Sequence, residues 1–400
     1  MNKSELLQLQ YEFNTSLILN PTENLPWRCK TDISFTEGLY IPEDTRDKDS
    51  KVCFAGRNNL RNLMTELYCN WEQALKAKAS SFKLYSGLHA HIILFMSIAS
   101  IGDKVLYLPE QAGGHYATKK ILQRLGLEIK EFAIDYENFC IDIERTKHII
   151  DQWNPQFIFV DRSDGLVYED FSWLNSYTDC YKIFDASQYL THILAGDYKN
   201  PFDMGMDLIL TTLHKNYPGP QKAAFFVKYQ NEMWEKIENG LMSYVSNSHP
   251  KEIFKAVLSF PGKSVLKKYS KMMLENTLQL ENTLIQNDVP VVRRDPALIS
   301  TQQIWIPIAD ENTGFHFFKK LEHLKILTNY RTLPYNIGRG LRLGTAAATR
   351  QGLIPETAAV IANLISETYH SEEIKSDLVK KAEKIMLEIQ KNTPQDFNAY

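Results

Sequence analysis

The sequence lacks the features of a membrane-embedded, secreted or nucleic-acid-binding protein. No run approaches the ~20 consecutive apolar residues that a membrane-spanning helix requires, and residues 1–13 are polar, without the apolar core of a signal peptide. The net charge is −3 and the lysines and arginines are scattered, so no basic surface for nucleic acid or anionic lipid is predicted. We therefore expect a cytoplasmic protein that binds neither membranes nor nucleic acid.

Cysteine is also scarce. The five cysteines are odd in number, far apart in the sequence and without a CxxC pair, which argues against a disulfide framework and against a zinc site. Reduced thiols in a reducing compartment are the expected state. The five positions are Cys29, Cys53, Cys69, Cys140 and Cys180.

The length of 400 residues exceeds what one hydrophobic core usually holds, so two domains are expected. Toward the C-terminus, short strands at Val291–Arg293 and Gln303–Ile308 mix with a long charged helix near Ser371–Gln390, which is typical of a small α+β domain. The predicted division is an N-terminal arm over residues 1–35, a large domain over residues 36–285 and a small domain over residues 286–400.

In the middle of the chain, short apolar runs alternate with helix-length segments such as His115–Leu125 and Ile143–Trp153. Continuous apolar strands between helices are typical of a mostly parallel sheet that is covered on both faces. The sequence therefore predicts an α/β architecture for the large domain. The predicted strands are Lys104–Leu108, Phe157–Asp161, Lys182–Asp185, Leu208–Thr212 and Ala223–Val227.

Reactive side chains follow two of these predicted strands. In an open parallel sheet, ligands bind at the carboxyl ends of the strands. Asp185 ends one strand, and Lys215 follows another strand thirty positions later in the chain. A lysine amine can form a Schiff base with a carbonyl compound, and pyridoxal phosphate (PLP) needs a carboxylate at its pyridine nitrogen. The pair predicts a PLP site with the cofactor bound covalently to Lys215.

A phosphate group needs backbone donors at a helix N-terminus. Ser86 and Gly87 precede an apolar, helix-like run and would supply a hydroxyl group and a close backbone approach. Taken singly, these residues have ordinary interpretations: a helix cap at Ser86, a surface lysine at position 215 and a structural ion pair at Arg342. The order in which they occur together is what favours a PLP enzyme.

This ordered set resembles the serine (glycine) hydroxymethyltransferase family from about Leu17 to Leu353. The most specific block, DASQYLTHILAG…DLILTTLHKNYPGP over Asp185–Pro220, is similar to the family pattern DxAHxxG…DxxTTTTHKTxxGP. The resemblance implies the aminotransferase-like fold type I of PLP enzymes. The shorter matching blocks are LILNPTENL (17–25, family LIASEN), FTEG (35–38, family YAEG), SGLHAH (86–91, family SGSQAN), GGH (113–115) and GLRLGTAAATRQG (340–352, family GxRxGTPAxTxRG).

The resemblance also implies a role for each matched residue. Lys215 would carry the cofactor with support from His214, Asp185 would pair with the protonated ring nitrogen, and His115 would stack on the ring. Ser86, Gly87 and His89 would bind the phosphate end. Ser163, Thr212 and Gln188 would surround the ring hydroxyl and the lysine, and Gln188 replaces a histidine of the family pattern.

Three further residues would serve the substrate. Arg342 would bind the substrate carboxylate through its bidentate fork, and Thr22 would lie near that carboxylate. Glu37 takes the place of an acid/base glutamate that, in the family, reaches the site of the neighbouring subunit. A homodimer is therefore expected.

Several positions depart from the family pattern. Cys53 and Phe54 replace paired tyrosines, and Glu110 and Tyr116 replace apolar positions that contact folate. The further changes are Phe35 for a tyrosine, Leu88 for a serine and YVSNSHP (244–250) for a glycine-rich loop. The part that handles PLP and an α-amino acid is retained and the part that handles folate is altered, which puts dependence on tetrahydrofolate in doubt.

Three functions remain open from the sequence. The first is hydroxymethyltransferase-like cleavage or formation of a Cα–Cβ bond in an α-amino acid. The second is a folate-independent threonine aldolase, a transaldolase that uses an aldehyde, or another specialised PLP enzyme of secondary metabolism. The third is a relative that binds PLP without catalysis. The presence of Lys215, Asp185, His115 and Arg342 together argues against the third.

Overall fold

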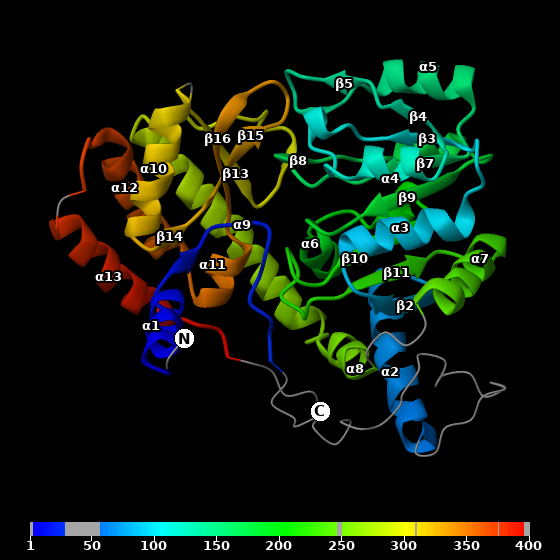
Figure 1. Ribbon diagram of the computed structural model, residues 1–400, viewed down its shortest axis with the longest axis horizontal. Helices are drawn as coiled ribbons and strands as arrows, with labels where there is room; N and C mark the ends of the chain where they lie inside the picture. Colours follow the sequence, from blue (N-terminus) through cyan, green and yellow to red (C-terminus); the bar gives the residue numbers. More distant parts are fainter. Residues whose placement is uncertain (1–2, 29–56, 246–249, 309, 375, 396–400) are drawn as a thin grey trace. The chain divides into compact units, whose positions relative to one another are not determined.

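The computed structural model describes residues 3–28, 57–245, 250–308, 310–374 and 376–395. The chain forms two compact units, which we call the large unit and the small unit (Figure 1). The large unit comprises Pro26–Asp164 and Glu169–Lys267, and the small unit comprises Met1–Leu25, Gly165–Tyr168 and Lys268–Gln395. The N-terminal segment thus belongs to the same unit as the C-terminal part of the chain.

A seven-stranded sheet forms the centre of the large unit, in the order β2-β11-β10-β9-β7-β3-β4. Neighbouring strands are parallel except at β11, which is antiparallel to both β10 and β2. The sheet is therefore mostly parallel, as predicted. The strands are β2 (Ala79–Leu84), β3 (Lys104–Tyr107), β4 (Glu128–Glu131), β7 (Phe157–Val160), β9 (Tyr181–Asp185), β10 (Leu208–Thr212) and β11 (Ala223–Val227).

Both faces of this sheet are apolar because helices cover both. Successive side chains of a strand point to opposite faces, and in β11 Phe225 joins the core formed with α3 and α7, whereas the Phe226 ring lies 6.1 Å from that of Trp71 in α2. Figure 1 shows α3 and α7 against the sheet. The helices of this unit include α2 (Arg57–Leu75), α3 (Gly87–Ile98), α4 (Thr118–Arg124), α5 (Ile143–Trp153), α6 (Leu190–Ala195), α7 (Glu232–Gly240) and α8 (Pro250–Leu258).

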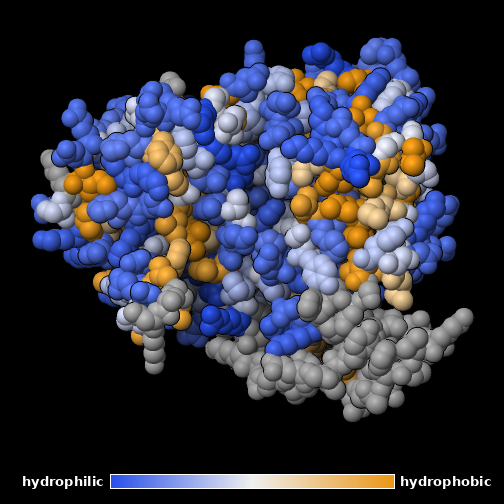
Figure 2. Space-filling model, in the orientation of Figure 1, coloured by the Kyte–Doolittle hydropathy of each residue, from blue (hydrophilic) through white to orange (hydrophobic). Residues whose placement is uncertain are grey.

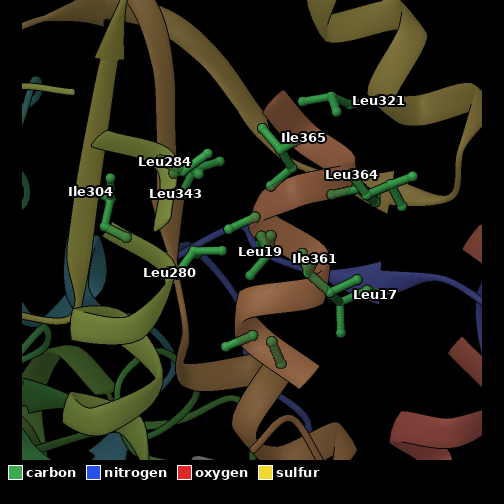
Figure 3. Packing of buried hydrophobic residues seen from close by; sticks show 14 of the residues in the cluster. Leu17, Leu19, Leu280, Leu284, Ile304, Leu321, Leu343, Ile361, Leu364 and Ile365 are labelled. Carbon is green, nitrogen blue, oxygen red and sulfur yellow. The ribbon is translucent and has the colours of Figure 1, made fainter. Parts of the chain in front are cut away.

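The small unit is built on a three-stranded antiparallel sheet, β13-β16-β15. Its core joins residues far apart in the chain: Leu17 and Leu19 pack with Leu280 and Ile361 (Figure 3). The strand β1 (Leu17–Ile18) adds to this core by pairing with β14 (Ile326–Leu327). The other elements are β13 (Gln303–Pro307), β15 (Asn329–Leu333), β16 (Gly338–Gly344), α1 (Lys3–Asn14), α9 (Lys263–Gln286), which begins in the large unit, α10 (Glu311–His323), α11 (Ala346–Gln351), α12 (Pro355–His370) and α13 (Ser376–Lys391).

Most of the predicted elements are confirmed. Each predicted strand of the large domain agrees with the structure to within one residue at either end, and the predicted helix Ile143–Trp153 is α5. The predicted strand Val291–Arg293 is wrong: Val292 donates one backbone hydrogen bond to Trp305 at 2.9 Å, but no ladder continues from it. Pro290 precedes this segment. Because proline has no N–H group, position 290 cannot donate a hydrogen bond that would extend a ladder from this end.

Two strands of the large sheet escaped the sequence prediction. β2 is buried although it carries two serines and a lysine, and β4 alternates Glu and Lys with Ile at an exposed edge. Neither is an apolar run, so the pattern used for the other strands does not apply.

Among the described residues no helix has the length and apolarity to cross a membrane, and the face in Figure 2 is largely hydrophilic with separate hydrophobic patches.

Candidate active site

The predicted site residues of the large unit converge on one edge of the sheet. β9 and β10 are parallel neighbours in which Leu210 pairs with Asp185, so both strands end at this edge. Ala223 of β11 pairs with Thr212 of β10 and with Leu84 of β2, which brings the start of α3 to the same edge. The parallel strands β3 and β7 also end here.

The loop after β10, which carries Lys215, is fixed to the turn after β9. The Thr212 N–H donates to Ser187 Oγ at 2.9 Å, and the Asn216 side chain accepts a hydrogen bond from the Thr191 N–H at 2.7 Å. The Thr191 hydroxyl in turn donates to the Asn216 carbonyl at 2.9 Å. These bonds hold the backbone on both sides of Lys215 in place.

Asp185 is buried and remains ionised. Burial by itself would raise the pKa of its carboxyl group. A hydrogen bond from His91 Nε2 at 3.0 Å, another from the Ser187 N–H at 2.8 Å and the positive charge of Lys215 outweigh burial, so the pKa is lowered. The result is a desolvated carboxylate whose pKa is influenced by the positive charge of Lys215.

A second buried acid lies behind His91. The Thr118 hydroxyl is hydrogen-bonded to Asp161 Oδ2 and lies 3.4 Å from His91 Nδ1. Burial raises the pKa of Asp161 well above its usual range, and the negative charge of Asp185 raises it further. Asp161 Oδ1 has no hydrogen-bond partner. The pKa shift of Asp161 is therefore opposite in direction to that of Asp185.

His115 sits beside this pair of acids. Its ring centroid lies 5.3 Å from that of His91 at an interplanar angle of 76°, and its backbone N–H donates to Asp161 Oδ2 at 3.4 Å. The loop before it is anchored to the end of β7, because the Gly113 carbonyl accepts from the N–H groups of Ser163 (2.8 Å) and Asp164 (3.0 Å). This anchor brings two predicted residues, His115 and Ser163, to the same edge.

Two polar atoms at the end of β10 are buried without a hydrogen-bond partner: Thr212 Oγ1 and His214 Nδ1. Burial lowers the pKa of His214 to about 4, with a smaller contribution from the charge of Lys215. His214 is therefore neutral at neutral pH. Buried polar atoms normally have partners, so these two atoms, within three residues before Lys215, are consistent with a bound polar group beside them.

The start of α3 supplies the third part of the site. Ser86 caps the helix, and its Oγ accepts from the His89 N–H at 3.2 Å. Gly87 packs closely on Thr212: a Cβ at this position would lie 3.0 Å from the threonine methyl group. Burial lowers the pKa of His89, aided by the charge of Lys222. A neutral histidine and the N-terminal N–H groups of a helix can bind an anionic phosphate group.

The remaining predicted residues fall in three places. Gln188 is buried in the turn after β9. Arg342 is buried in β16 and belongs to the small unit, as does Thr22, whose hydroxyl donates to Asn20 at 2.8 Å. Within that unit, the Gly344 N–H donates to the Leu19 carbonyl at 2.8 Å, so the segment leading to Thr22 runs beside the end of β16. Glu37, Phe35, Cys53, Phe54 and the loop centre 246–249 lie outside the described residues.

The residues present fit PLP. An ionised buried aspartate suits a pyridinium nitrogen, a lysine next to it suits the aldehyde, and a helix N-terminus suits the phosphate group. No group of three or more His, Cys, Asp or Glu residues that could hold a metal ion occurs in the part of the chain that the structure describes.

The serine hydroxymethyltransferase family model matches residues 71–365, well over half of the chain. The chain belongs to this family. A serine hydroxymethyltransferase of Metallosphaera sedula is 26% identical over 348 residues, which cover 83% of this chain and 80% of the relative. A fluorothreonine transaldolase of Streptantibioticus cattleyicolor is 25% identical over 309 residues, 75% of this chain and 48% of that protein.

The fold of this serine hydroxymethyltransferase family member agrees with a solved structure. The crystal structure of L-threonine transaldolase from Pseudomonas fluorescens in its internal aldimine state superposes with a TM-score of 0.84 and 20% sequence identity, over 98% of this chain and 91% of that one. The predicted family and the predicted fold type I of PLP-dependent enzymes are confirmed. The chain is thus a PLP-dependent enzyme of the hydroxymethyltransferase type.

The sequence prediction missed three residues of the site: His91, Thr118 and Asp161. His91 follows Gly87 by four positions, so it lies on the face of α3 that carries the helix start. The apolar run HIILF is expected to face a sheet. A histidine within such a run is buried and therefore needs a hydrogen-bond partner. That requirement could have drawn attention to His91, although nothing in the sequence identifies the partner.

Proposed function

We propose that this enzyme binds PLP covalently through Lys215 and breaks or forms the Cα–Cβ bond of a β-hydroxy-α-amino acid. The proposal depends on one observation: the buried carboxylate of Asp185 accepts hydrogen bonds from His91 Nε2 and the Ser187 N–H at the end of β9, one strand away from the loop that carries Lys215. A desolvated carboxylate in that position favours a protonated pyridine nitrogen. Family membership supports the amino-acid substrate.

The chain's own side chains have separable tasks in this proposal. When bound, PLP supplies an electron sink for negative charge at the Cα of an attached amino acid. Asp185 accepts the hydrogen bond of the ring nitrogen, His115 borders the ring, and neutral His214 adds no second positive charge beside Lys215. Ser86, Gly87 and His89 bind the phosphate end, with Ser163, Gln188 and Thr212 bordering the remaining polar edge.

The substrate residues of the proposal come from elsewhere in the chain. Arg342, with Thr22 nearby, binds the substrate carboxylate through its planar guanidinium. Cleavage of the Cα–Cβ bond requires removal of the proton from the β-hydroxyl group, and Glu37 is the proposed base. General base catalysis of this kind is typically worth ~10²–10⁴-fold.

We further propose that tetrahydrofolate is not required. Glu110 and Tyr116 flank His115, and both are exposed, Tyr116 to 57%. They stand where the family pattern has apolar residues that contact folate, so an apolar folate surface is not expected here. The transaldolases among the similar proteins favour a second candidate function, in which an aldehyde accepts the glycine carbon released from a β-hydroxy amino acid.

The first experiment tests the attachment of the cofactor. Purified protein is loaded with PLP, reduced with borohydride, digested and analysed by mass spectrometry. We expect the adduct on Lys215, none in K215A, and an unchanged adduct in K236A, a variant of a half-exposed lysine on α7. Lys222 is the buried alternative, with its Nζ 3.0 Å from the Lys83 carbonyl. An adduct on Lys222 would refute the assignment.

The second experiment tests the reaction. The enzyme is incubated with serine and tetrahydrofolate, with threonine alone, and with threonine plus an aromatic aldehyde, and glycine, acetaldehyde and new β-hydroxy amino acids are measured. Folate-independent release of acetaldehyde supports an aldolase, and a new β-hydroxy amino acid supports a transaldolase. Efficient serine cleavage that requires tetrahydrofolate would contradict the proposed folate independence.

A cytoplasmic homodimer is part of the same proposal. Three apolar side chains of α1, Leu7, Tyr11 and Phe13, are 55%, 61% and 64% exposed, which is the kind of surface that interfaces bury. If Glu37 serves the partner's site, an equal mixture of inactive E37Q and K215A chains should recover up to about a quarter of the activity of the same amount of wild type. About half of the dimers in such a mixture are mixed, and each mixed dimer has one intact site out of two. No recovery in dimers shown to be mixed would refute the shared site.

A further inference from the structure

Four buried side chains form a continuous hydrogen-bonded chain behind the cofactor site. Asp161 follows β7, Thr118 begins α4, His91 lies in α3 and Asp185 ends β9. The links are Asp161 to Thr118, Thr118 to His91 at 3.4 Å and His91 to Asp185 at 3.0 Å. All four residues are at most 9% exposed. The chain thus runs from the end of β7 through α4 and α3 to one oxygen of Asp185.

The hydrogen bond between His91 and Asp185 has a defined direction. The Asp185 carboxylate can only accept, so His91 Nε2 must carry the proton. On the other side of the imidazole, the Thr118 hydroxyl lies 3.4 Å from His91 Nδ1 and donates to Asp161 Oδ2. Thr118 and Asp161 therefore support the His91 ring in the orientation that aims its Nε2–H at the carboxylate.

Asp185 keeps acceptor capacity for one further group. An ionised carboxylate has about four acceptor positions. His91 occupies one on Oδ2 and the Ser187 N–H occupies one on Oδ1. The rings of Phe159 and His115, with centroids 5.0 Å and 5.3 Å from that of His91, close off the sides of the imidazole. His91 thus has a single orientation in which it can serve Asp185.

We propose that His91 is a positioning residue that holds the Asp185 carboxylate ionised and oriented, and thereby keeps the proton on the cofactor's ring nitrogen rather than on Asp185. The inference rests on the proposed function of the site. Without the His91 N–H, a buried carboxylate favours its neutral form. The proton would then move from the ring nitrogen to an Asp185 oxygen, leaving a neutral pyridine and a neutral acid with no change in total charge.

A purely structural role for His91 makes a different prediction. A buried polar chain can stabilise the packing of α3 and α4 on the sheet without any effect on the cofactor. Removing the imidazole would then lower the stability of the protein but leave the protonation of a bound ring unchanged. The state of the ring nitrogen is therefore the measurement that separates the two roles.

The test uses the full-length protein loaded with PLP that carries ¹⁵N at the ring nitrogen. The variants H91F and H91L remove the donor and keep an apolar side chain in the apolar helix, and H91N keeps a side-chain N–H. Solid-state ¹⁵N NMR reports ring protonation, and equilibrium dialysis reports cofactor affinity. Circular dichroism of each apoprotein establishes which variants fold, and two donor-free variants are used so that at least one can be measured.

We expect the wild type and H91N to give the resonance of a protonated ring, and H91F or H91L to give that of a neutral ring. Cofactor affinity should fall by roughly 10- to 100-fold in the donor-free variants, the usual cost of a lost hydrogen bond to a charged group. A protonated ring in a folded donor-free variant would overturn the role of His91 alone. A wild type that does not bind PLP would instead overturn the proposed function.

Discussion

Replacing Gly113 with alanine should distort the loop that carries His115, and the structure supplies a matched control. Gly113 and Gly196 both have φ +86°, a left-handed conformation that an L-residue rarely adopts. A Cβ on Gly113 would lie 1.8 Å from the Asp164 carbonyl oxygen, whereas a Cβ on Gly196 would meet nothing within 4 Å. The two variants share the backbone strain, and only G113A adds a clash with backbone.

The expected magnitudes differ accordingly. The left-handed conformation costs alanine about 1–2 kcal/mol, and the lower entropy of the unfolded chain returns about 0.4–1 kcal/mol, so G196A should lose about 1 kcal/mol. Relieving the overlap at Gly113 should cost about 1–3 kcal/mol more. At about 2–4 °C per kcal/mol for a unit of this size, G196A should lower Tm by about 3 °C and G113A by about 5–15 °C.

The assay is thermal unfolding of both apoproteins followed by circular dichroism, together with the affinity of each for PLP. The Gly113 carbonyl binds the N–H groups of Ser163 and Asp164, so displacing it should weaken cofactor binding in G113A. G196A, at the end of α6, should bind PLP as the wild type does. Equal losses of Tm in the two variants would refute the steric reasoning.

Three further predictions concern single side chains. His214 has a folded-state pKa of about 4 against an ordinary value of 6.5, so its contribution to stability is present above pH 6.5 and is lost as the pH falls toward 4. In urea unfolding, H214N should therefore lose about 3 kcal/mol less unfolding free energy than the wild type over that pH range. An equal loss in the two proteins would contradict the burial of a neutral ring. Because the pKa of Asp161 is raised in the folded protein, the contribution of this residue to stability is present below its ordinary pKa and is lost as the pH rises. The Tm of D161N relative to the wild type should therefore be higher at pH 8 than at pH 5. The same difference in Tm at both pH values would argue against a raised pKa. The buried hydroxyl of Tyr217 donates a 2.6 Å hydrogen bond to a backbone carbonyl, so Y217F should cost about 1–2 kcal/mol in urea unfolding, whereas Y229F, at a residue 54% exposed, should cost almost nothing.

The strands that the sequence identified correctly share one property. Phe157–Val160 and Leu208–Thr212 are buried on both faces, so every position is apolar or a small threonine and the run stands out from its neighbours. β2 is buried as completely but contains Ser80, Ser81 and Lys83; the Ser80 hydroxyl donates to Glu72 of α2, and Lys83 Nζ lies 3.6 Å from the sulfur of Met242. Such a strand cannot be distinguished until those partners are known.

The same limit governs the site. Lys215 and Asp185 were predicted because Asp185 ends one recognisable strand, Lys215 comes three residues after another, and parallel strands end at one edge of a sheet. His91, Thr118 and Asp161 were not, because their chemistry depends on hydrogen bonds between α3, α4 and the end of β7. Each is an ordinary polar residue in its own segment of the sequence.

The sequence by itself determined the family and the positions of the main strands, because short motifs and local apolar runs carry both, and it predicted Lys215 and Asp185 as the centre of a site. Only the tertiary structure decided in which direction the pKa of each buried acid shifts. Asp185 and Asp161 both end or follow an apolar strand, yet the hydrogen bonds and nearby positive charges at Asp185 outweigh burial, whereas at Asp161 burial and the charge of Asp185 outweigh its hydrogen bonds. The opposite shifts arise from those surroundings, which form only when distant segments pack together.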